Sequence, residues 1–270
     1  MKNIKHYLLA CRDLAKDASI QIREAWQSRD IPFKFQKTED EVIITGYKSS
    51  LLPRIEVPGE ILGFPVRTVG ARAFVECPFL EEVRIADGVE ILEANAFSSC
   101  THLTKVFMGD SVSVIGRNAF FECKYLFCVE LSPSLREIDN RAFFGCTGLR
   151  DIYLPDGIER IGDQAFYGCT NLKSITLPQN LTAIEDHAFY ECSSLTSITI
   201  PDSVTSIGKC AFFGCTRLSK VVFQNTSGWS CLQYSWQTKP TTISSSSLSN
   251  SNTAAICLTE TYVFADWTRN

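Results

Sequence analysis

A single period of 23 residues runs through the middle of this sequence and constrains its fold more than any other feature. An Ala-Phe dipeptide recurs without insertion or deletion, and its phenylalanine stands at Phe74, Phe97, Phe120, Phe143, Phe166, Phe189 and Phe212. A cysteine follows three residues after each phenylalanine, and a leucine three residues after that. Seven copies in unbroken register indicate a repeat array in which each copy is one structural unit.

Each unit follows the pattern A-F-x-x-C-x-x-L-x-x-I-x-L-P-x-x-V-x-x-I-G-x-x. Its middle alternates apolar and polar residues, as at Ile198 and Ile200, and this alternation predicts a short half-buried strand. The Pro201-Asp202 step ends that strand and begins a turn, and Gly208 allows the next bend. We expect the Ala-Phe step to form a short helical turn that directs the phenylalanine into the interior.

One such unit cannot bury its own apolar face, so neighbouring units must stack. Stacked strands lie about 4.8 Å apart, and they would build a parallel sheet in which equivalent residues form rows. The phenylalanines are then a continuous internal row. We interpret that row as core and not as an aromatic ligand site, because its spacing is the spacing of the fold.

These motifs resemble the BspA-like class of leucine-rich repeats. The likeness is close over residues 66–223, where A-F-x-x-C and I-x-L-P recur, and it extends to IEVPGEILGFPVRTVG before the array and to FQNTSGWSCLQY and LTETYVFADWTRN after it. The resemblance implies an α/β leucine-rich-repeat solenoid, shaped as a horseshoe or an arc, with a parallel sheet on one face and short helical turns on the other. It also implies adhesion or protein binding, usually at a microbial cell surface. The chain departs from the pattern where Glu93, Asp139 and Glu185 replace the glycine of the bend.

We interpret the whole chain, residues 1–270, as a single leucine-rich-repeat domain. Residues 1–31 are expected to form an N-terminal helix, and 32–65 an N-terminal cap with two short strands within 33–47. Residues 66–223 are the repeats, and 224–270 are expected to form a C-terminal cap. The serine-rich stretch 241–252 has the composition of a linker. We expect it to be ordered within the cap, because the apolar pattern of LTETYVF follows it.

The predicted N-terminal helix carries small and apolar residues spaced alternately by four and three positions. This seam has coiled-coil spacing and consists of Ile4, Leu8, Cys11, Ala15, Ala18, Ile22 and Ala25. Two interpretations stay open. The helix either covers the first repeat as a cap, or it binds a second copy or another partner through residues 2–30.

Charge and hydropathy exclude two classes of partner. The net charge is -4 and the calculated isoelectric point about 5.5, which argues against nucleic-acid binding. No apolar run approaches the ~20 residues of a membrane-spanning helix. The chain shows no signal peptide and contains twelve cysteines, so as given it predicts a cytoplasmic protein. Removal of a signal would place the protein at the cell surface or outside the cell.

No motif indicates catalysis, a metal or a cofactor. Seven of the cysteines are fixed by the repeat and are expected to be buried, unpaired thiols. The five-residue spacing of Cys123 and Cys128 does not fit a zinc pair. The three histidines fall at variable or flanking positions, and no nucleophile elbow, P-loop or zinc-protease motif is present. We therefore predict a protein that is not an enzyme and needs no cofactor.

Function is expected at the variable positions on the outer side of the strands. These positions change in character along the array. The first four units carry charged and aromatic residues, whereas the fifth and sixth carry only Ser174, Thr176, Ser197 and Thr199. Aromatic and arginine side chains most often anchor interfaces. The predicted partner-binding residues are Arg84, Phe107, Phe127, Arg150 and Tyr153.

Two function classes follow. The first is a non-catalytic protein-binding or adhesion module that uses the outward face of the solenoid to bind another protein or a cell-surface macromolecule. The alternative is an intracellular scaffold or regulatory subunit that oligomerises through its N-terminal helix. The packing of Phe107 and Phe127 under a flanking segment is the competing structural explanation for these aromatic residues.

Overall fold

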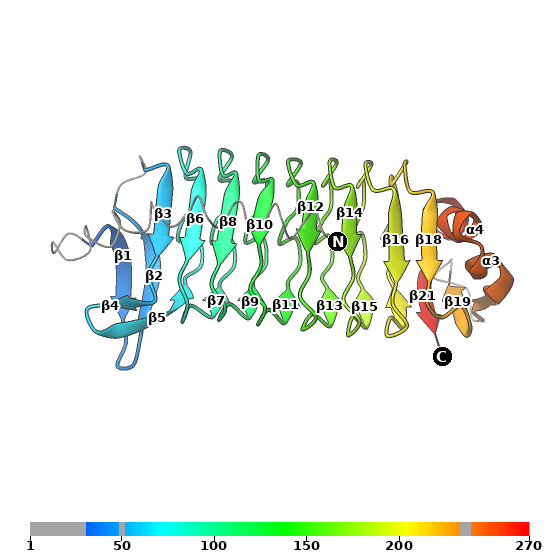
Figure 1. Ribbon diagram of the computed structural model, residues 1–270, viewed down its shortest axis with the longest axis horizontal. Helices are drawn as coiled ribbons and strands as arrows, with labels where there is room; N and C mark the ends of the chain where they lie inside the picture. Colours follow the sequence, from blue (N-terminus) through cyan, green and yellow to red (C-terminus); the bar gives the residue numbers. More distant parts are fainter. Residues whose placement is uncertain (1–30, 49–51, 233–238, 270) are drawn as a thin grey trace.

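The fold is a parallel β-solenoid that forms a nearly straight rod (Figure 1). We analysed it in a computed structural model that describes residues 31–48, 52–232 and 239–269. The predicted N-terminal helix over 1–31 lies outside the described residues except for Ile31. The predicted solenoid of stacked 23-residue units is confirmed, since equivalent residues of consecutive units pair in register throughout the array.

Each coil contributes one strand to each of two faces. On the first face, which we call the long sheet, the inward residue of each coil stacks in one row from Val69 and Leu92 to Ile207. Its repeat strands are β5 (Phe64–Val69), β7 (Ile91–Leu92), β9 (Val114–Ile115), β11 (Glu137–Ile138), β13 (Arg160–Ile161), β15 (Ala183–Ile184) and β17 (Ser206–Ile207).

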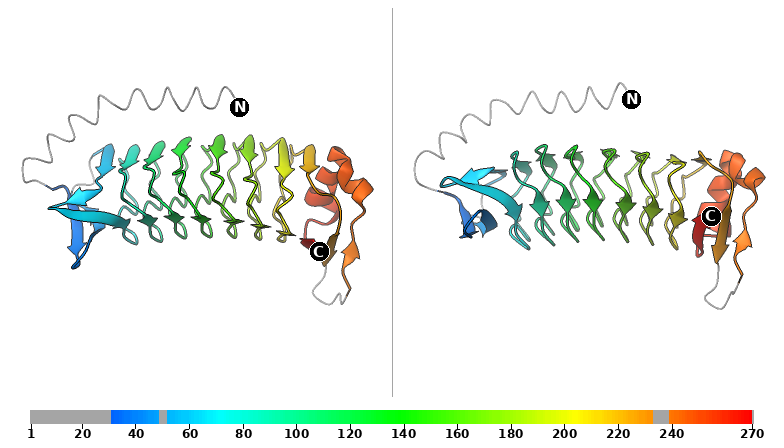
Figure 2. Two further views of the ribbon diagram at one scale, coloured as in Figure 1. Left: turned by 60° about the horizontal axis from the view of Figure 1, so that its bottom comes forward. Right: turned by 90° about the horizontal axis from the view of Figure 1, so that it is seen from below.

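The second face, which we call the outward face, carries the strands that the sequence predicts. They are β3 (Arg54–Val57), β6 (Glu82–Ile85), β8 (Lys105–Met108), β10 (Cys128–Glu130), β12 (Asp151–Tyr153), β14 (Ser174–Thr176), β16 (Ser197–Ile200) and β18 (Lys220–Phe223). Hydrogen bonding breaks this face into three parallel groups, but the strands follow one another along the rod (Figure 2). In β14, Ile175 points into the core while Ser174 and Thr176 point to solvent.

The Ala-Phe step is not helical, and this part of the prediction is wrong. The residue before each alanine and the residue two after each phenylalanine adopt positive φ, for example 60° at Arg72 and 56° at Glu76. Successive backbone N–H groups there donate alternately to the next coil and to their own coil. Phe74 N–H donates to the Ala96 carbonyl of the next coil, whereas Ala73 N–H donates back to Gly70. Consecutive turns joined from coil to coil thus replace the expected helix.

The predicted phenylalanine row is the centre of the core. The seven rings are at most 1% exposed, and neighbouring rings stack with centroids 5.0–5.5 Å apart. Parallel-displaced stacking of aromatic rings adds to the free energy gained by burying their area. One cluster of buried apolar side chains continues from Phe33 to Trp267.

The N-terminal end is closed by a hairpin of β1 (Phe33–Lys37) and β2 (Val42–Tyr47), which confirms the two strands predicted within 33–47. Strand β2 continues parallel to β5, and β4 (Glu60–Ile61) pairs antiparallel with β5. The ring of Phe33 meets Phe74 edge to face at 6.2 Å, so it covers the first ring of the phenylalanine row.

The C-terminal end is closed by β19 (Trp229–Leu232), β20 (Thr241–Thr242), α3 (Ser245–Ser249), α4 (Ser251–Ile256), a π-helical turn (Cys257–Thr261) and β21 (Asp266–Arg269). The serine-rich stretch is ordered here, as predicted. Ser244 and Asn250 accept backbone hydrogen bonds as N-caps of α3 and α4, which is the role that these residue types favour. Strand β21 pairs antiparallel with β17 and with β19.

Candidate interaction surface

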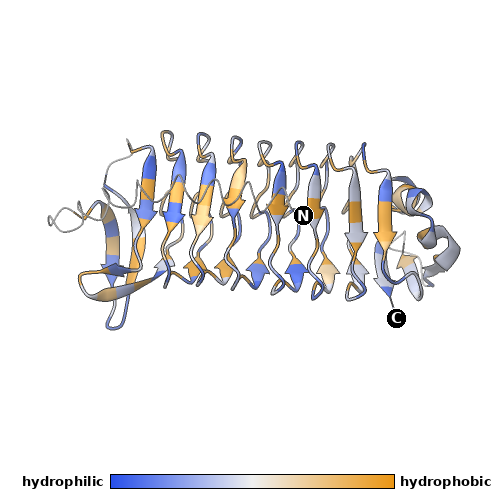
Figure 3. Ribbon diagram, viewed as in Figure 1, coloured by the Kyte–Doolittle hydropathy of each residue, from blue (hydrophilic) through white to orange (hydrophobic). Residues whose placement is uncertain are grey.

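The outward face changes its chemistry between its first strands and its last. Figure 3 shows β8 and β10 coloured mostly as hydrophobic, whereas β14 and β16 are paler apart from the inward residue. Ser174, Thr176, Ser197 and Thr199 are all exposed. Among them, the Ser174 hydroxyl donates to Asp151 Oδ1 of the preceding strand at 2.7 Å. These variable residues therefore face solvent on the strands where the repeat register places them.

Arg84 and Phe107 lie side by side on β6 and β8, where they are register partners. The Arg84 guanidinium carbon lies 4.3 Å from the centroid of the Phe107 ring, and Arg84 Nη2 lies 2.8 Å from Glu82 Oε1. This arrangement combines a cation–π contact with an ion pair. Phe107 is only 8% exposed, so its ring is not available to a partner in this conformation.

Phe127, Arg150 and Tyr153 are accessible. Phe127 precedes β10 and Arg150 occupies the same position before β12, one coil further along. Phe127 is 37% exposed, Tyr153 is 55% exposed, and Arg150 is also exposed. The structure thus brings three of the five predicted residues together on adjacent coils as a solvent-facing group of two aromatic rings and one guanidinium.

The sequence analysis missed two further exposed aromatic residues in the first and third units. Phe79 and Tyr125 are well exposed, and each occupies the position before the recurring leucine of its unit. Tyr125 also contacts the ring of His102 from the preceding unit, with centroids 6.3 Å apart. The same position holds Gly148, Asn171 and Ser194 in later units. Comparing the residue before the repeat leucine from unit to unit would have shown that aromatic residues occur there only in the first units.

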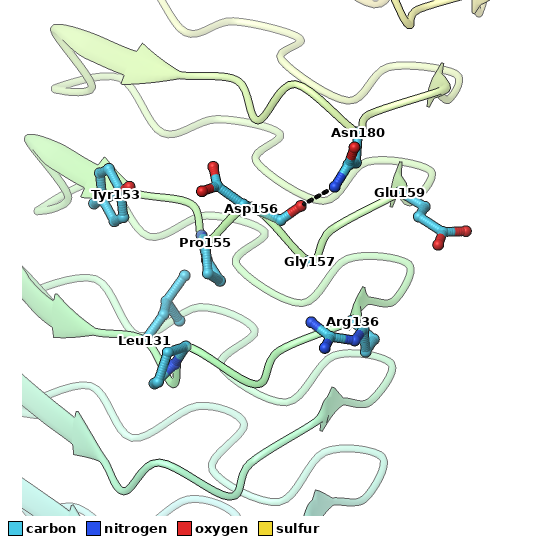
Figure 4. A pocket seen from close by; sticks show the side chains of 9 residues that line it. Leu131, Arg136, Tyr153, Pro155, Asp156, Gly157, Glu159 and Asn180 are labelled. Atoms are coloured by element: carbon cyan, nitrogen blue, oxygen red, sulfur yellow. Dashed lines mark hydrogen bonds between the residues drawn. The ribbon is translucent and has the colours of Figure 1, made fainter.

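A shallow pocket of about 560 Å³ begins at Tyr153 and follows the turn after β10 and β12 (Figure 4). Arg136 and Asp156 supply charge at its wall, and Asn180 Nδ2 donates to the Asp156 carbonyl at 3.0 Å. A Cβ at Gly157 would displace the flexible Arg136 guanidinium and would also come within 2.8 Å of the Leu135 carbonyl oxygen, so this turn has little room for a side chain. The pocket presents an aromatic edge, a cation and a carboxylate next to the accessible group.

Comparisons with known proteins place this architecture in a family. The model of the BspA type leucine-rich repeat region matches residues 67–192 and 137–262, in six copies. The chain belongs to the BspA-type leucine-rich repeat family.

Solved structures of bacterial leucine-rich repeat proteins are similar to this BspA-type chain. The leucine-rich repeat protein of Treponema pallidum is 32% identical with a TM-score of 0.66, over 69% of this chain and 88% of that one. A leucine-rich cell surface protein of Faecalibacterium prausnitzii is 33% identical with a TM-score of 0.67, over 74% of this chain and 55% of that one. A Bacteroides ovatus relative is 27% identical with a TM-score of 0.51, over 73% and 65%. No curated protein matches.

A second aromatic row lies on the turn side of this BspA-type solenoid, and the sequence analysis missed it too. It comprises the residue after Ala-Phe in five consecutive units: Phe121, Phe144, Tyr167, Tyr190 and Phe213. Their rings stack at 4.5–5.0 Å and are half-buried. Because each ring covers the faces of its neighbours, the row presents ring edges to solvent. We interpret it as a support for the turns.

The repeat cysteines from Cys100 to Cys215 are buried in the core of the BspA-type array, and their thiols are hydrogen-bonded to the backbone. From Cys100 to Cys215, each thiol donates to the phenylalanine carbonyl of the preceding coil at 3.0–3.3 Å. Burial raises the pKa of the Cys123 and Cys215 thiols to about 12, so they are neutral at physiological pH. In the described ranges, no three His, Cys, Asp or Glu side chains are arranged to hold a metal ion. The described helices are also too short or too polar to cross a bilayer.

Proposed function

We propose that this chain is a protein-binding module whose partner contacts the outward face at Phe127, Arg150 and Tyr153. The observation that carries the proposal is the concentration of exposed aromatic residues on the first units and their replacement by serine and threonine further along. Aromatic and arginine side chains give large contact areas with few rotatable bonds, so they contribute most to the free energy of binding. Arg84 and Phe107 take a supporting role, since their own contact leaves little of Phe107 exposed.

The pocket beside Tyr153 extends the proposed contact. A partner side chain of modest size can enter between Tyr153 and Arg136, and a carboxylate or backbone carbonyl would meet the Arg136 guanidinium. The shallow form of the pocket and the lack of a catalytic motif favour recognition over chemistry. Membership of the family and the similarity to a leucine-rich cell surface protein of Faecalibacterium prausnitzii support adhesion as the setting.

Two matched variants test the proposal. The first replaces Phe127, Arg150 and Tyr153 with alanine, and the second replaces Ser174, Thr176 and Thr199 with alanine on the same face. A partner captured by the wild-type chain should be retained by the second variant and lost by the first. Each single substitution in the first set should weaken binding by ~1–3 kcal/mol in calorimetric titration.

The free energy of unfolding of both variants should stay near that of the wild-type chain, because these side chains face solvent. Equal losses of affinity in the two sets, or a loss confined to the serine and threonine set, would refute the proposed site.

A further inference from the structure

The first cysteine of the repeat row differs from the other six in its surroundings. From Cys100 to Cys215, the repeat cysteines are at most 2% exposed, and each thiol donates to the phenylalanine carbonyl of the preceding coil. Cys77 is only half-buried, and among the described residues its thiol is hydrogen-bonded to the sulfur of Cys100 and not to a carbonyl. The row therefore begins with an accessible pair of free thiols and continues as a closed core.

The backbone holds these two thiols side by side. Glu76 N–H, directly before Cys77, donates to the Ser98 carbonyl of the next coil at 2.8 Å. From that coil, the Cys100 thiol donates back to the Phe74 carbonyl at 3.0 Å. Neighbouring coils lie ~4.8 Å apart, which is inside the range of ~4.4–6.8 Å between Cα atoms that a disulfide can bridge. The equivalent cysteines of the first two units can therefore be joined without a large movement of the backbone.

Oxidation breaks fewer hydrogen bonds at this pair than at any other neighbouring pair of the row. A disulfide has no thiol protons, so a bond between Cys146 and Cys169 would remove the donors of two buried phenylalanine carbonyls. A bond between Cys77 and Cys100 removes only the donor of the Phe74 carbonyl. A buried carbonyl that loses its donor destabilises the fold. The first pair is therefore the one whose oxidation the fold opposes least, and its half-buried member is open to a reagent that the core thiols exclude.

The contact between the two thiols also assigns them different roles. The hydrogen bond from Cys100 lowers the pKa of the Cys77 thiol from its ordinary value of 9.0, although burial acts in the opposite direction. The contact with Cys77, together with burial, raises the pKa of the Cys100 thiol, so that thiol keeps its proton. A thiolate, and not a thiol, attacks a disulfide. Cys77 is therefore the attacking group, and Cys100 is the thiol that follows.

We propose that Cys77 and Cys100 form a dithiol that a low-molecular-weight disulfide, such as oxidised glutathione, converts to an intramolecular disulfide. The Cys77 thiolate attacks one sulfur of the reagent, forms a mixed disulfide and releases one glutathione thiolate, which takes up a proton. The Cys100 thiol then loses its proton to solvent and attacks the Cys77 sulfur, which closes the protein disulfide and releases the second glutathione. Two protein thiols are thereby oxidised, and one reagent disulfide is reduced to two thiols.

The bond joins the first two coils covalently at the N-terminal end of the array. It closes the chain between residues 77 and 100, which restricts the unfolded state and stabilises the fold. The chain gains this link in an oxidising environment and loses it in a reducing one. The inference does not depend on the proposed partner site, because it concerns other side chains and its test needs no partner.

Peptide mapping of the full chain tests the proposal. Reduced native protein is incubated with oxidised glutathione, unfolded, alkylated and mapped without reduction. The wild-type chain should yield a linked peptide pair that contains Cys77 and Cys100, while Cys146 and Cys169 are recovered as alkylated thiols. The variant Cys100→Ser should stop at the mixed disulfide of Cys77 with glutathione, and Cys77→Ser should leave Cys100 reduced. Circular dichroism before the addition of the reagent verifies that both variants are folded.

Urea titration of the same samples tests the effect of the bond. The urea concentration at half-unfolding should be higher for oxidised than for reduced wild-type protein, and it should be the same after both treatments of Cys77→Ser. An unmodified Cys77, a persistent mixed disulfide at Cys77 in the wild type, or a disulfide between two chains would overturn the proposal. So would the linkage of a core pair such as Cys146 and Cys169 before the first pair. An unchanged or lower midpoint after oxidation would overturn the stabilising role of the bond.

Discussion

The thiol of Cys169 donates a hydrogen bond to the backbone carbonyl of Phe143, 3.3 Å away in the preceding coil. That carbonyl also accepts the N–H of Cys146 in its own coil, at 3.2 Å. Both lone pairs of a buried carbonyl are thereby satisfied, and the repeat cysteine has a structural role that alanine or valine could not fill. The recurrence of this bond explains why a chain with a row of adjacent cysteines needs no disulfide to account for them.

The stability of the fold should decrease in alkali because of these thiols. Cys123 and Cys215 have pKa values of about 12 in the folded chain, raised by burial from an ordinary value of 9.0. The folded state therefore holds these protons after the unfolded state has released them. The contribution of these thiols to the free energy of unfolding should be constant below pH ~8 and should then fall from pH ~9 towards 12, by up to ~1.4 kcal/mol for each pH unit and thiol.

Urea titrations between pH 7 and 11 measure this dependence. The variant Cys123→Ala serves as the control, because it removes one titrating group and should show a shallower fall. An identical slope in wild type and variant would assign the alkaline loss to other groups.

Truncation of the phenylalanine row should be costly at its centre. Phe166→Ala removes a fully buried ring that stacks on Phe143 and Phe189 at 5.5 Å, and it should lower the free energy of unfolding by ~3–5 kcal/mol. The matched variant Tyr167→Ala removes the neighbouring half-buried ring of the outer row and should cost only ~1–2 kcal/mol. Chemical denaturation of both variants gives the comparison. A larger loss from Tyr167→Ala would reverse the assignment of inner and outer rows.

A further prediction concerns the bend after the long-sheet strand, where glycine and an acidic residue alternate from coil to coil. Gly162 lies between Asp139 and Glu185, and a Cβ on Gly162 would come within 2.8 Å of Asn140 N and 2.9 Å of the Asp139 carbonyl carbon. Gly162→Ala should therefore destabilise the fold by ~1–3 kcal/mol through overpacking. Glu185→Ala, one coil further, should cost less than ~1 kcal/mol, because it removes only an exposed ion pair with Arg160.

Thermal melts of the two single variants test this alternation. Equal shifts would mean that each bend tolerates a side chain independently of its neighbours, as the replacements at Glu93, Asp139 and Glu185 suggest when the sequence is considered alone.

Two aromatic residues of the outward face should respond differently to truncation. Phe107→Ala should lower the free energy of unfolding by about 3 kcal/mol, because the ring is almost fully buried and supports Arg84. Tyr153→Ala should change it by less than ~0.5 kcal/mol, because the ring is mostly exposed. Urea denaturation measures both values. A neutral Phe107→Ala would show that its ring is not held in place.

The repeat register alone predicts most of the core, because a fixed period determines which residues of each unit face inward. It does not predict the turns. Arg72, Asn95 and Asn118 adopt positive φ without being glycine, and in each case the backbone N–H donates to a carbonyl of the next coil. Exposure on the outward face is unpredictable for a different reason. The sequence establishes that Phe107 and Tyr153 point outward, but only the three-dimensional packing distinguishes a covered ring from a free one.

The direction of β21 has a consequence for the protein in crowded solution. Every repeat strand offers its neighbour a parallel edge, so an unprotected last coil could accept the first coil of another molecule and extend into a fibre. Strand β21 runs the opposite way along β17 and turns its far edge to β19. The C-terminal segment thus blocks the edge on which another molecule could add its strands, and it keeps the protein from assembling end to end into a fibre.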